Sequence, residues 1–236
     1  MNEPFVHKLF KGRVKKIGDP NAKHAFDKQW ETGMFKNEIE DPIYLTETGL
    51  IGDDVADKKN HGGPEKALFA YPVGHYKYWK EKLQNDSIDV GGMGENLAML
   101  EMDEFTVCIG DTYQFGDAII QVSQPRRPCW KPARRYRVMD LALQIQNSGR
   151  TGWYFRVLQE GEVISRIDLE LLERPYPQWT IAACNEVMYI RKDDLKAASE
   201  LAECKYLAVN WKKSLKKRLI GRESLIDKRV FGPNKQ

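Results

Sequence analysis

The hydrophobic positions in the first 173 residues come mostly in short runs that Gly, Pro and Asp interrupt, which is typical of a sheet-rich domain. The clearest example is the segment 107–123, which two Gly-Asp pairs divide into three short runs that favour strands. In the last run the even-numbered positions are apolar, whereas Gln121 and Ser123 are polar. This alternation predicts a strand that is buried on one face, in a barrel or a sandwich.

Two other segments of this region have the three- or four-residue spacing of a helix. Apolar side chains recur at this spacing from Val73 to Leu83 and again from Tyr136 to Leu143. We therefore expect the sheet-rich domain to contain two helical segments.

The pattern changes after residue 173. The segment 174–177 contains two prolines, which exclude a continuous helix or a central strand, so we interpret it as a linker. Helix-prone stretches follow at 181–188, where Thr180 is the expected N-cap, at 192–201 and at 211–220. We predict a β-domain over 1–173, a small three-helix domain over 174–221 and a polar, partly disordered tail over 222–236.

Composition limits the size and the class of the protein. The chain has 236 residues, of which 42% are hydrophobic, enough for one substantial core and a small second domain. No apolar stretch approaches the roughly 20 residues that cross a bilayer, and the N-terminus lacks the pattern of a signal peptide. We therefore expect a cytoplasmic protein without a membrane partner.

The charged residues nearly balance, because 37 Lys and Arg against 34 Asp and Glu give a formal net charge of +3. Such a balance does not indicate a nucleic-acid-binding protein. The stretch 211–219 is locally basic, and Trp211, Leu215 and Leu219 recur in it at helical spacing. We interpret it as a helix with a solvated basic face; contact with nucleic acid or an acidic protein is the alternative.

The four cysteines contain no CxxC pair, which argues against a zinc ribbon and a disulfide framework. Cys129 differs from the others because it lies in a loop, 124–132, that contains three prolines and follows the predicted strand. Arg126, Arg127 and Lys131 favour its thiolate, the form that binds metals and attacks electrophiles. We predict that Cys129 is the reactive thiol.

A glycine-rich turn is the second candidate for ligand binding. Gly62 and Gly63 follow His61, so the backbone can approach a ligand closely and its successive N–H groups can form an anion-binding nest. Lys66 adds a positive charge, and His61 is the residue type best suited to proton transfer near neutral pH. The spacing matches neither a dinucleotide fingerprint nor a Walker loop. An ordinary hairpin with a capping histidine is the alternative.

Two further segments can complete a pocket. Glu95 and Asn96 end the glycine-rich segment 91–97 and can hydrogen bond to a heterocycle, although a surface ion pair and a turn also explain them. The segment 149–157 combines aromatic residues with arginines, which suits either a pocket for a planar ligand or a barrel strand.

The order of these motifs, GLIGDD, HGGPEKA, GENL, IGD and QVSQPRRPCWK, resembles that of bacterial MOSC-domain proteins of the YiiM type. The resemblance covers most of the first 173 residues, and the helices predicted after the linker are similar to the small C-terminal domain of that group. It implies a mainly β fold: a closed, largely antiparallel β-barrel with a few helices, followed by the three-helix domain.

The resemblance also implies a cofactor. Related molybdenum cofactor sulfurases and amidoxime-reducing enzymes carry a cysteine in this loop as a molybdenum ligand, so the resemblance assigns that role to Cys129. The cofactor is molybdenum bound to a pterin, Mo-molybdopterin. The residues expected around it are His61, Gly62, Gly63, Lys66, Glu95, Asn96, Arg126 and Cys129.

The activity implied by the resemblance is that of an oxidoreductase. Its substrates would be small N-hydroxylated compounds, such as hydroxylaminopurine-like base analogues, which it reduces to amines with Cys129 and His61 as catalytic residues. The sequence contains neither a ferredoxin-like cysteine cluster nor a dinucleotide fingerprint, so we expect a separate reductase as electron donor. Two alternatives stay open: a Cys129-based sulfur carrier or thiol activity without permanent metal, and a non-catalytic pterin or nucleic-acid binding module.

Overall fold

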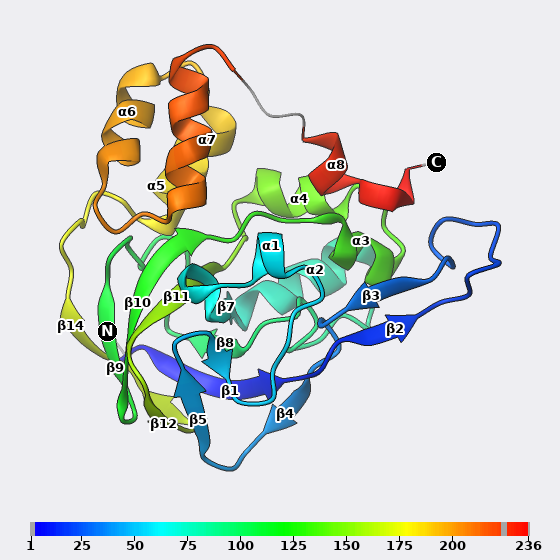
Figure 1. The fold of residues 1–236 in the computed structure, drawn as a ribbon, viewed down its shortest axis with the longest axis horizontal. Coiled ribbons are helices and arrows are strands. Elements are labelled where there is room, and N and C mark those ends of the chain that lie inside the picture. The colour runs from blue at the N-terminus through cyan, green and yellow to red at the C-terminus, as the bar shows by residue number, and fades with distance from the viewer. Residues whose placement is uncertain (1–2, 223–225, 236) are drawn as a thin grey trace.

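A strongly curled β-sheet forms the centre of the computed structural model, which describes residues 3–222 and 226–235 (Figure 1). Its strands follow one another through hydrogen bonds in the order β13 (Ile167–Asp168), β1 (Phe5–Lys11), β8 (Leu97–Leu100), β7 (Leu68–Pro72), β11 (Trp153–Gln159), β10 (Ala118–Pro125), β9 (Thr112–Phe115) and β14 (Glu170–Glu173). β4 (Asn37–Ile39) also pairs with β1. β7 and β8 run parallel and are connected by helix α2 (Gly74–Leu83).

Short elements complete the fold around this sheet. The small strands are β12 (Gly161–Val163), β5 (Ile43–Thr46) and β6 (Gly49–Leu50) in one sheet, and β2 (Lys15–Ile17) and β3 (Trp30–Thr32) in another. α1 (Lys58–His61) and the 3-10 turn η1 (Pro64–Lys66) precede β7. Within the described residues, no helix has the length and apolar character needed to cross a membrane.

The curled sheet is a half-barrel, so the closed barrel that the resemblance implied is a slight overstatement. Its two edge strands, β13 and β14, are consecutive in the chain but pair with different neighbours, β1 and β9. Leu169 lies between them, fully buried, and donates its N–H to the carbonyl of Pro4. The chain passes from one edge to the other, but no ladder of hydrogen bonds joins β13 to β14.

Strands β7 and β11 separate two hydrophobic cores because their side chains alternate between the two faces of the sheet. Leu68 and Ala70 of β7 belong to the core inside the half-barrel, whereas Phe69 and Tyr71 belong to a second core. Helices α2, α3 (Trp130–Tyr136) and α4 (Leu141–Ser148) cover this second core. Both faces of these strands are therefore buried, which explains their nearly continuous apolar sequences.

The predicted strands of the segment 107–123 are confirmed in part. The last run is β10, and a two-residue turn joins it to β9, as the second Gly-Asp pair predicts. Val107–Ile109 does not form a strand, because Cys108 makes only an isolated bridge. Gln121 and Ser123 are buried, since other parts of the chain cover their face of β10 as well.

Of the two helical segments predicted in this region, the first is confirmed as α2. The second is divided between α3 and α4. Arg137 adopts a left-handed conformation with φ of 57°, which ends α3 and turns the chain before α4 begins.

The helices predicted after the linker are confirmed as α5 (Ile181–Asn185), α6 (Leu195–Glu203) and α7 (Val209–Leu219), with a π-helical turn, η2 (Glu186–Ile190), after α5. Thr180 caps α5 by accepting a hydrogen bond of 3.0 Å from the N–H of Ala183. Trp211 and Leu215 of α7 are fully buried in the same continuous core as the half-barrel. The helices thus pack directly on the sheet (Figure 1), while the domain boundary after residue 173 stays a prediction.

The described part of the predicted tail, 226–235, is folded. It forms α8 (Asp227–Val230) and the 3-10 turn η3 (Gly232–Asn234). Asn234 donates a hydrogen bond of 3.1 Å to the carbonyl of Trp130 and accepts one of 2.7 Å from Nε of Arg134. Because Trp130 follows Cys129, the tail supports the loop that carries the predicted reactive thiol. The rest of the predicted tail apart from residue 222, at 223–225 and 236, lies outside the described residues.

Replacing Asn234 tests whether the tail stabilises the fold. Asn234→Ala removes both hydrogen bonds and leaves the buried Nε of Arg134 without its partner, so the unfolding free energy should fall by about 1–3 kcal/mol. Urea unfolding followed by tryptophan fluorescence measures this change. The control is Lys235→Ala at an exposed neighbour, which should change the free energy by less than about 0.5 kcal/mol. Equal, negligible effects of the two substitutions would show that the Asn234 hydrogen bonds contribute nothing to stability.

Candidate active site

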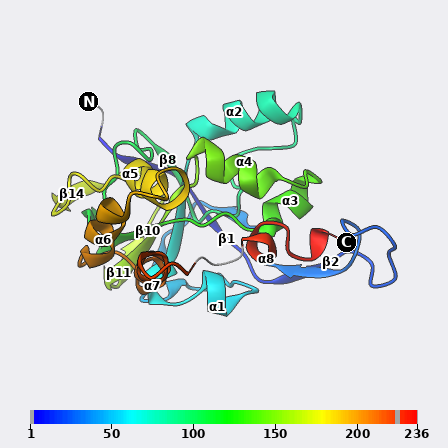
Figure 2. The same cartoon turned by 90° about the horizontal axis from the view of Figure 1, so that it is seen from above.

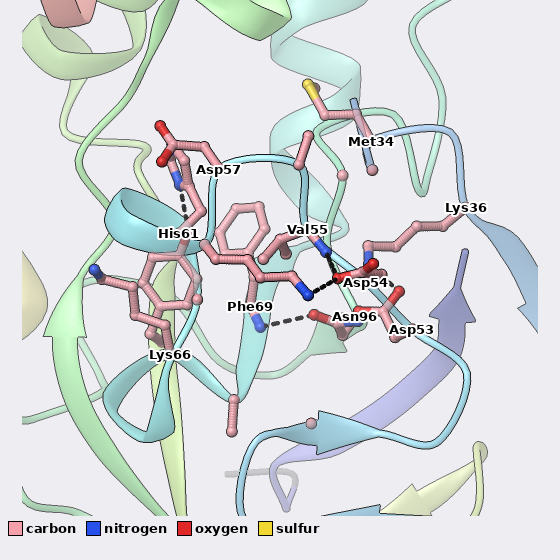
Figure 3. Close-up of a pocket in the computed structure, with 18 of the residues that line it drawn as sticks. Met34, Lys36, Asp53, Asp54, Val55, Asp57, His61, Lys66, Phe69 and Asn96 are labelled. Atoms are coloured by element: carbon pink, nitrogen blue, oxygen red, sulfur yellow. Dashed lines mark hydrogen bonds and ion pairs between the residues drawn. The ribbon is translucent and has the colours of Figure 1, made fainter. Parts of the chain in front are cut away.

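A cavity of about 340 Å³ lies where the predicted motifs meet, between α1, the segment 53–58, the start of β7 and the loop after β10. Figure 3 shows His61 and Lys66 on one side of it and Asp53 and Asn96 on the other. Seven of the eight residues expected around a cofactor line this cavity: His61, Gly62, Gly63, Lys66, Asn96, Arg126 and Cys129.

The loop between β10 and α3 places Cys129 at this cavity. Pro125 ends β10, and Cys129 is the extended residue before α3, with φ of −123° and ψ of 172°. The residue is 7% exposed, so its sulfur is nearly buried and still lines the cavity. The proline-rich loop therefore presents the thiol on a short connection between a strand and a helix, as its sequence predicts.

The charge state of this thiol depends on its neighbours. Burial by itself raises the pKa of Cys129, but the charge and hydrogen bond of His61 and the charge of Arg126 outweigh it. With the backbone N–H of Lys131, they lower this pKa to about 6, so the thiolate predominates at neutral pH. Arg127, expected from the sequence to contribute charge as well, points to α7 and donates a hydrogen bond of 2.9 Å to a serine hydroxyl there.

The other three cysteines have the opposite character. Burial raises the pKa of Cys108 to about 11. It also raises the pKa of Cys184 and of Cys204. These thiols are therefore protonated near neutral pH, and Cys129 is the one cysteine whose surroundings favour the thiolate.

His61 is the last residue of α1, a single turn that Asp57 caps by accepting a backbone N–H. Nδ1 of its ring shares a hydrogen bond of 3.2 Å with the hydroxyl of Tyr154. Burial raises the pKa of Tyr154 to about 12, so this hydroxyl keeps its proton near neutral pH. The His61 ring is thus held between a phenol and the Cys129 thiolate, where a proton-transferring group can act beside the sulfur.

Asn96 lines the cavity, but its side chain is engaged inside the protein. Its Nδ2 donates hydrogen bonds to the carbonyl of Phe10 and to Asp53, and its Oδ1 accepts the N–H of Phe69. Asp53 also pairs with the buried Lys36. Asn96 therefore holds the wall of the cavity together, while its contact with a bound heterocycle stays a prediction.

Glu95 is the one predicted cofactor-binding residue that does not line the cavity. Its carboxylate is fully buried and accepts hydrogen bonds from the hydroxyl of Tyr76 and from the N–H groups of Gly91 and Met93. Glu95 thus orders the glycine-rich segment before it. A polar residue after such a segment can bind the local backbone as well as a ligand, which is why its sequence position is ambiguous.

The glycine turn after His61 does not form the predicted anion-binding nest. Gly62 is extended, with φ of −110° and ψ of −177°, and its N–H donates to the carbonyl of Lys58 at 3.1 Å, which closes α1. Gly63 has φ of 93°, a value that residues with side chains avoid, and a Cβ there would meet no atom within 4 Å. The turn therefore presents bare backbone to the cavity.

Arg126 contributes an unsatisfied donor to the cavity. The residue is 4% exposed, and its guanidinium carbon lies 4.7 Å from the ring centroid of Phe69. Its Nη1 has no hydrogen-bond partner among the residues that the structure describes. This donor can therefore bind an acceptor on a ligand in the cavity, or a water molecule.

Two groups that shape the cavity, Lys36 and Tyr154, are not evident as site residues from the sequence. Lys36 is buried against Asp53 and belongs to no motif, so only the folded chain brings the two together. Tyr154 lies in the aromatic segment that suggested a pocket, between Trp153 and Phe155, which are buried in the barrel core. Strand alternation is the pattern that could have separated them, because residue 154 faces away from the core that its two neighbours fill.

Comparison with known proteins identifies the family. The MOSC domain model matches residues 57–166, and the YiiM-like, 3-alpha helix domain model matches residues 179–221. The chain is 37% identical over 202 residues to YflK of Bacillus subtilis, a protein described as uncharacterized, covering 86% of this chain and 91% of YflK. It is 35% identical over 199 residues to a protein of Gibberella moniliformis named Reductase, covering 83% of this chain and 34% of that protein.

A solved structure agrees with these matches. The crystal structure of YiiM from Geobacillus stearothermophilus matches with a TM-score of 0.76 at 31% sequence identity, covering 92% of this chain and 99% of that one. The chain therefore belongs to the MOSC-domain family. The matched three-helix domain and the likeness to YiiM confirm the resemblance to the YiiM type that the sequence motifs indicate.

Alkylation by iodoacetamide tests the charge state of Cys129. Its rate should rise with pH through a midpoint of about 6, because only the thiolate reacts. His61→Ala removes the charge and the hydrogen bond that oppose the effect of burial on Cys129. The midpoint should therefore rise by about 1 pH unit or more. Mass spectrometry of the Cys129 peptide measures the rate, and Cys129→Ser gives the background. A wild-type midpoint at the ordinary cysteine value of about 8.5 would contradict the assignment.

Proposed function

We propose that this protein is a molybdenum-cofactor-dependent oxidoreductase that reduces N-hydroxylated compounds, such as hydroxylaminopurine-like bases, to amines. The observation that carries the proposal is the Cys129 thiolate, stabilised by His61 and Arg126 at a ligand-sized cavity. MOSC domains are associated with molybdenum cofactor binding, and a relative of this chain is named Reductase. Both facts support the proposal.

The groups around the cavity suit a molybdenum-pterin cofactor. A thiolate is a soft ligand that fits a sulfur-rich metal centre, and a pterin dithiolene brings the other sulfur donors. The volume of about 340 Å³ lies within the range of small-molecule sites. Nη1 of Arg126 is a buried donor without a partner, and the rings of Phe69 and Tyr154 line the cavity with flat apolar surface.

Each residue has its own task in this proposal. Cys129 would hold the metal, while Arg126 and Lys66 would bind the polar and negatively charged parts of the pterin. When bound, the cofactor supplies the two-electron redox couple that cleaves the N–O bond. His61 holds a proton on its ring beside the reacting atoms, and the hydroxyl of Tyr154 fixes the orientation of that ring.

The reaction consumes two electrons and two protons for each substrate. The N–O bond breaks, the nitrogen keeps its bond to carbon and leaves as an amine, and the oxygen leaves as water. His61 can deliver one of the protons because its ring lines the cavity near the thiolate. We propose that the electrons come from a separate donor protein, since the sequence has no ferredoxin-like cysteine cluster and no dinucleotide fingerprint.

A second candidate function uses the same thiolate without a permanent metal. A thiol with a pKa of about 6 also suits a carrier that holds sulfur as a persulfide or forms a mixed disulfide. Because the low pKa of Cys129 favours both candidates, it does not distinguish them. They are distinguished by metal content and by the reaction catalysed.

Elemental analysis of protein made in a cofactor-synthesising host tests the proposal. Wild type should contain about one molybdenum per chain and reduce 6-hydroxylaminopurine with a chemical electron donor. Cys129→Ser should lose molybdenum and activity by more than about 10-fold, because it lacks the protein ligand. Circular dichroism verifies that the variant is folded.

Cys204→Ser is the matched control for this experiment, since it changes a buried thiol that does not line the cavity and should keep metal and activity. Equal molybdenum in wild type and Cys129→Ser would show that Cys129 is not the ligand. Wild type without molybdenum, but with a reactive persulfide on Cys129, would favour the sulfur carrier.

A further inference from the structure

A second cavity, of about 660 Å³, adjoins the first one. Cys129, His61 and Tyr154 line both cavities, so the two meet at the reactive thiol. The walls of the second cavity come from α1, the Cys129 loop, α7 and α8. Both views of the fold show α7 and α8 on either side of α1 (Figures 1 and 2).

We name this second space the basic cavity, because cations dominate its lining. Eight cationic side chains line it, beside the single carboxylate of Asp57. The eight are Lys59, Lys66, Arg127, Lys131, Lys213, Lys217, Lys228 and Arg229. Across the described segments 3–222 and 226–235, none of the eight forms a salt bridge.

The hydrogen-bond partners of these cations are neutral. Arg127 donates to the hydroxyl of Ser214, and Lys66 donates to a backbone carbonyl at 2.8 Å. Arg229 donates to the carbonyl of Pro128 and to the side-chain oxygen of a glutamine. These contacts orient the side chains but do not cancel their charge, so the positive potential of the cavity is available to an anionic ligand.

Two of these charges come from the basic stretch 211–219, whose sequence predicts a solvated helix face. Lys213 and Lys217 are four residues apart on α7 and line the basic cavity together with Ser214. Trp211 and Leu215 of the same helix are fully buried in the core. The apolar side therefore anchors α7, and this anchoring holds the two lysines in the wall of the basic cavity.

We propose that the basic cavity binds the phosphate of a nucleotide, so that the substrate is an N-hydroxylated nucleoside phosphate instead of a free base. The inference rests on the proposed function, because Cys129 marks the end of the cavity where the N-hydroxyl group is reduced. A phosphate monoester carries about −1.5 to −2 charges at pH 7, which matches a cationic lining without carboxylate partners. An uncharged base gains no charge–charge attraction from these cations.

The dimensions of the cavity favour a small molecule over a nucleic-acid strand. Its volume of about 660 Å³ falls within the range of small-ligand sites. Its lining also includes the ring of Trp130 beside Cys129, which offers a stacking surface to a heterocycle. The base thus lies toward the thiol and the phosphate toward Lys213 and Lys217.

Calorimetric titration of the purified chain with adenosine 5′-monophosphate and with adenosine tests this site. Wild type should bind the monophosphate at least about 10-fold more tightly than adenosine, and added salt should reduce the difference. In the double variant Lys213→Gln/Lys217→Gln, most of this difference in affinity between the two ligands should disappear. Lys216→Gln is the matched control, because Lys216 lies on the same helix but pairs with Glu203 and does not line the cavity. Equal affinities for the two ligands in wild type would overturn the proposal.

Two further measurements distinguish a nucleotide phosphate from other possible ligands of the basic cavity. The double variant made in a cofactor-synthesising host should keep the molybdenum and pterin content of wild type, whereas loss of cofactor would assign the basic cavity to the cofactor's own phosphate. A single-stranded oligonucleotide of about 20 bases should bind no more tightly than the monophosphate per site. Much tighter binding that the double variant abolishes would overturn the proposal in favour of a nucleic-acid strand.

Turnover distinguishes failure of this inference from failure of the proposed function. Wild type should reduce the 5′-monophosphate of N6-hydroxyadenosine with a kcat/KM at least about 10-fold above that for 6-hydroxylaminopurine, and the double variant should remove this preference. Reduction of both with equal kcat/KM would overturn the nucleotide preference and leave the reductase intact. Reduction of neither, with tight binding of the monophosphate, would overturn the reductase and retain the phosphate site.

Discussion

The pairing of the Cys129 thiolate with His61 is the interaction on which the rest of the site depends. Burial alone makes a thiol harder to ionise, and this cysteine is nearly buried. The groups that reverse the effect come from two separate segments, α1 and the loop after β10 that leads into α3. The fold therefore determines the charge of the sulfur by bringing these segments together, and without that arrangement Cys129 would resemble the three inert cysteines.

The two cores of the molecule explain how this arrangement is held. Strands β7 and β11 are packed on both faces, which makes this part of the sheet rigid. The segment that carries His61 enters β7, and the loop that carries Cys129 follows β10, the neighbour of β11, so both are attached to this rigid part. α7 is anchored in one core, and the folded tail supports the start of α3. The sulfur consequently lies between two cavities of different chemistry, one that suits a flat, partly polar cofactor and one that is strongly cationic.

Features that depend on neighbouring residues could be predicted from the sequence, and features that depend on distant contacts could not. The cap at Thr180, the turn before β10 and the proline-stiffened loop around Cys129 follow from local chemistry. Segments far apart in the chain determine three other features: the gap between the edge strands of the half-barrel, the burial of Lys36 and the direction of Arg127. Glu95 shows the limit most clearly, because ligand binding and loop support require the same residue type.

X-ray absorption at the molybdenum edge tests most directly whether Cys129 supplies a sulfur ligand to molybdenum. The cofactor-loaded protein should show three sulfur neighbours around the metal, two from the dithiolene and one from Cys129. The fraction of molybdenum that Cys129→Ser retains should show two. Identical sulfur counts in the two proteins would contradict the account.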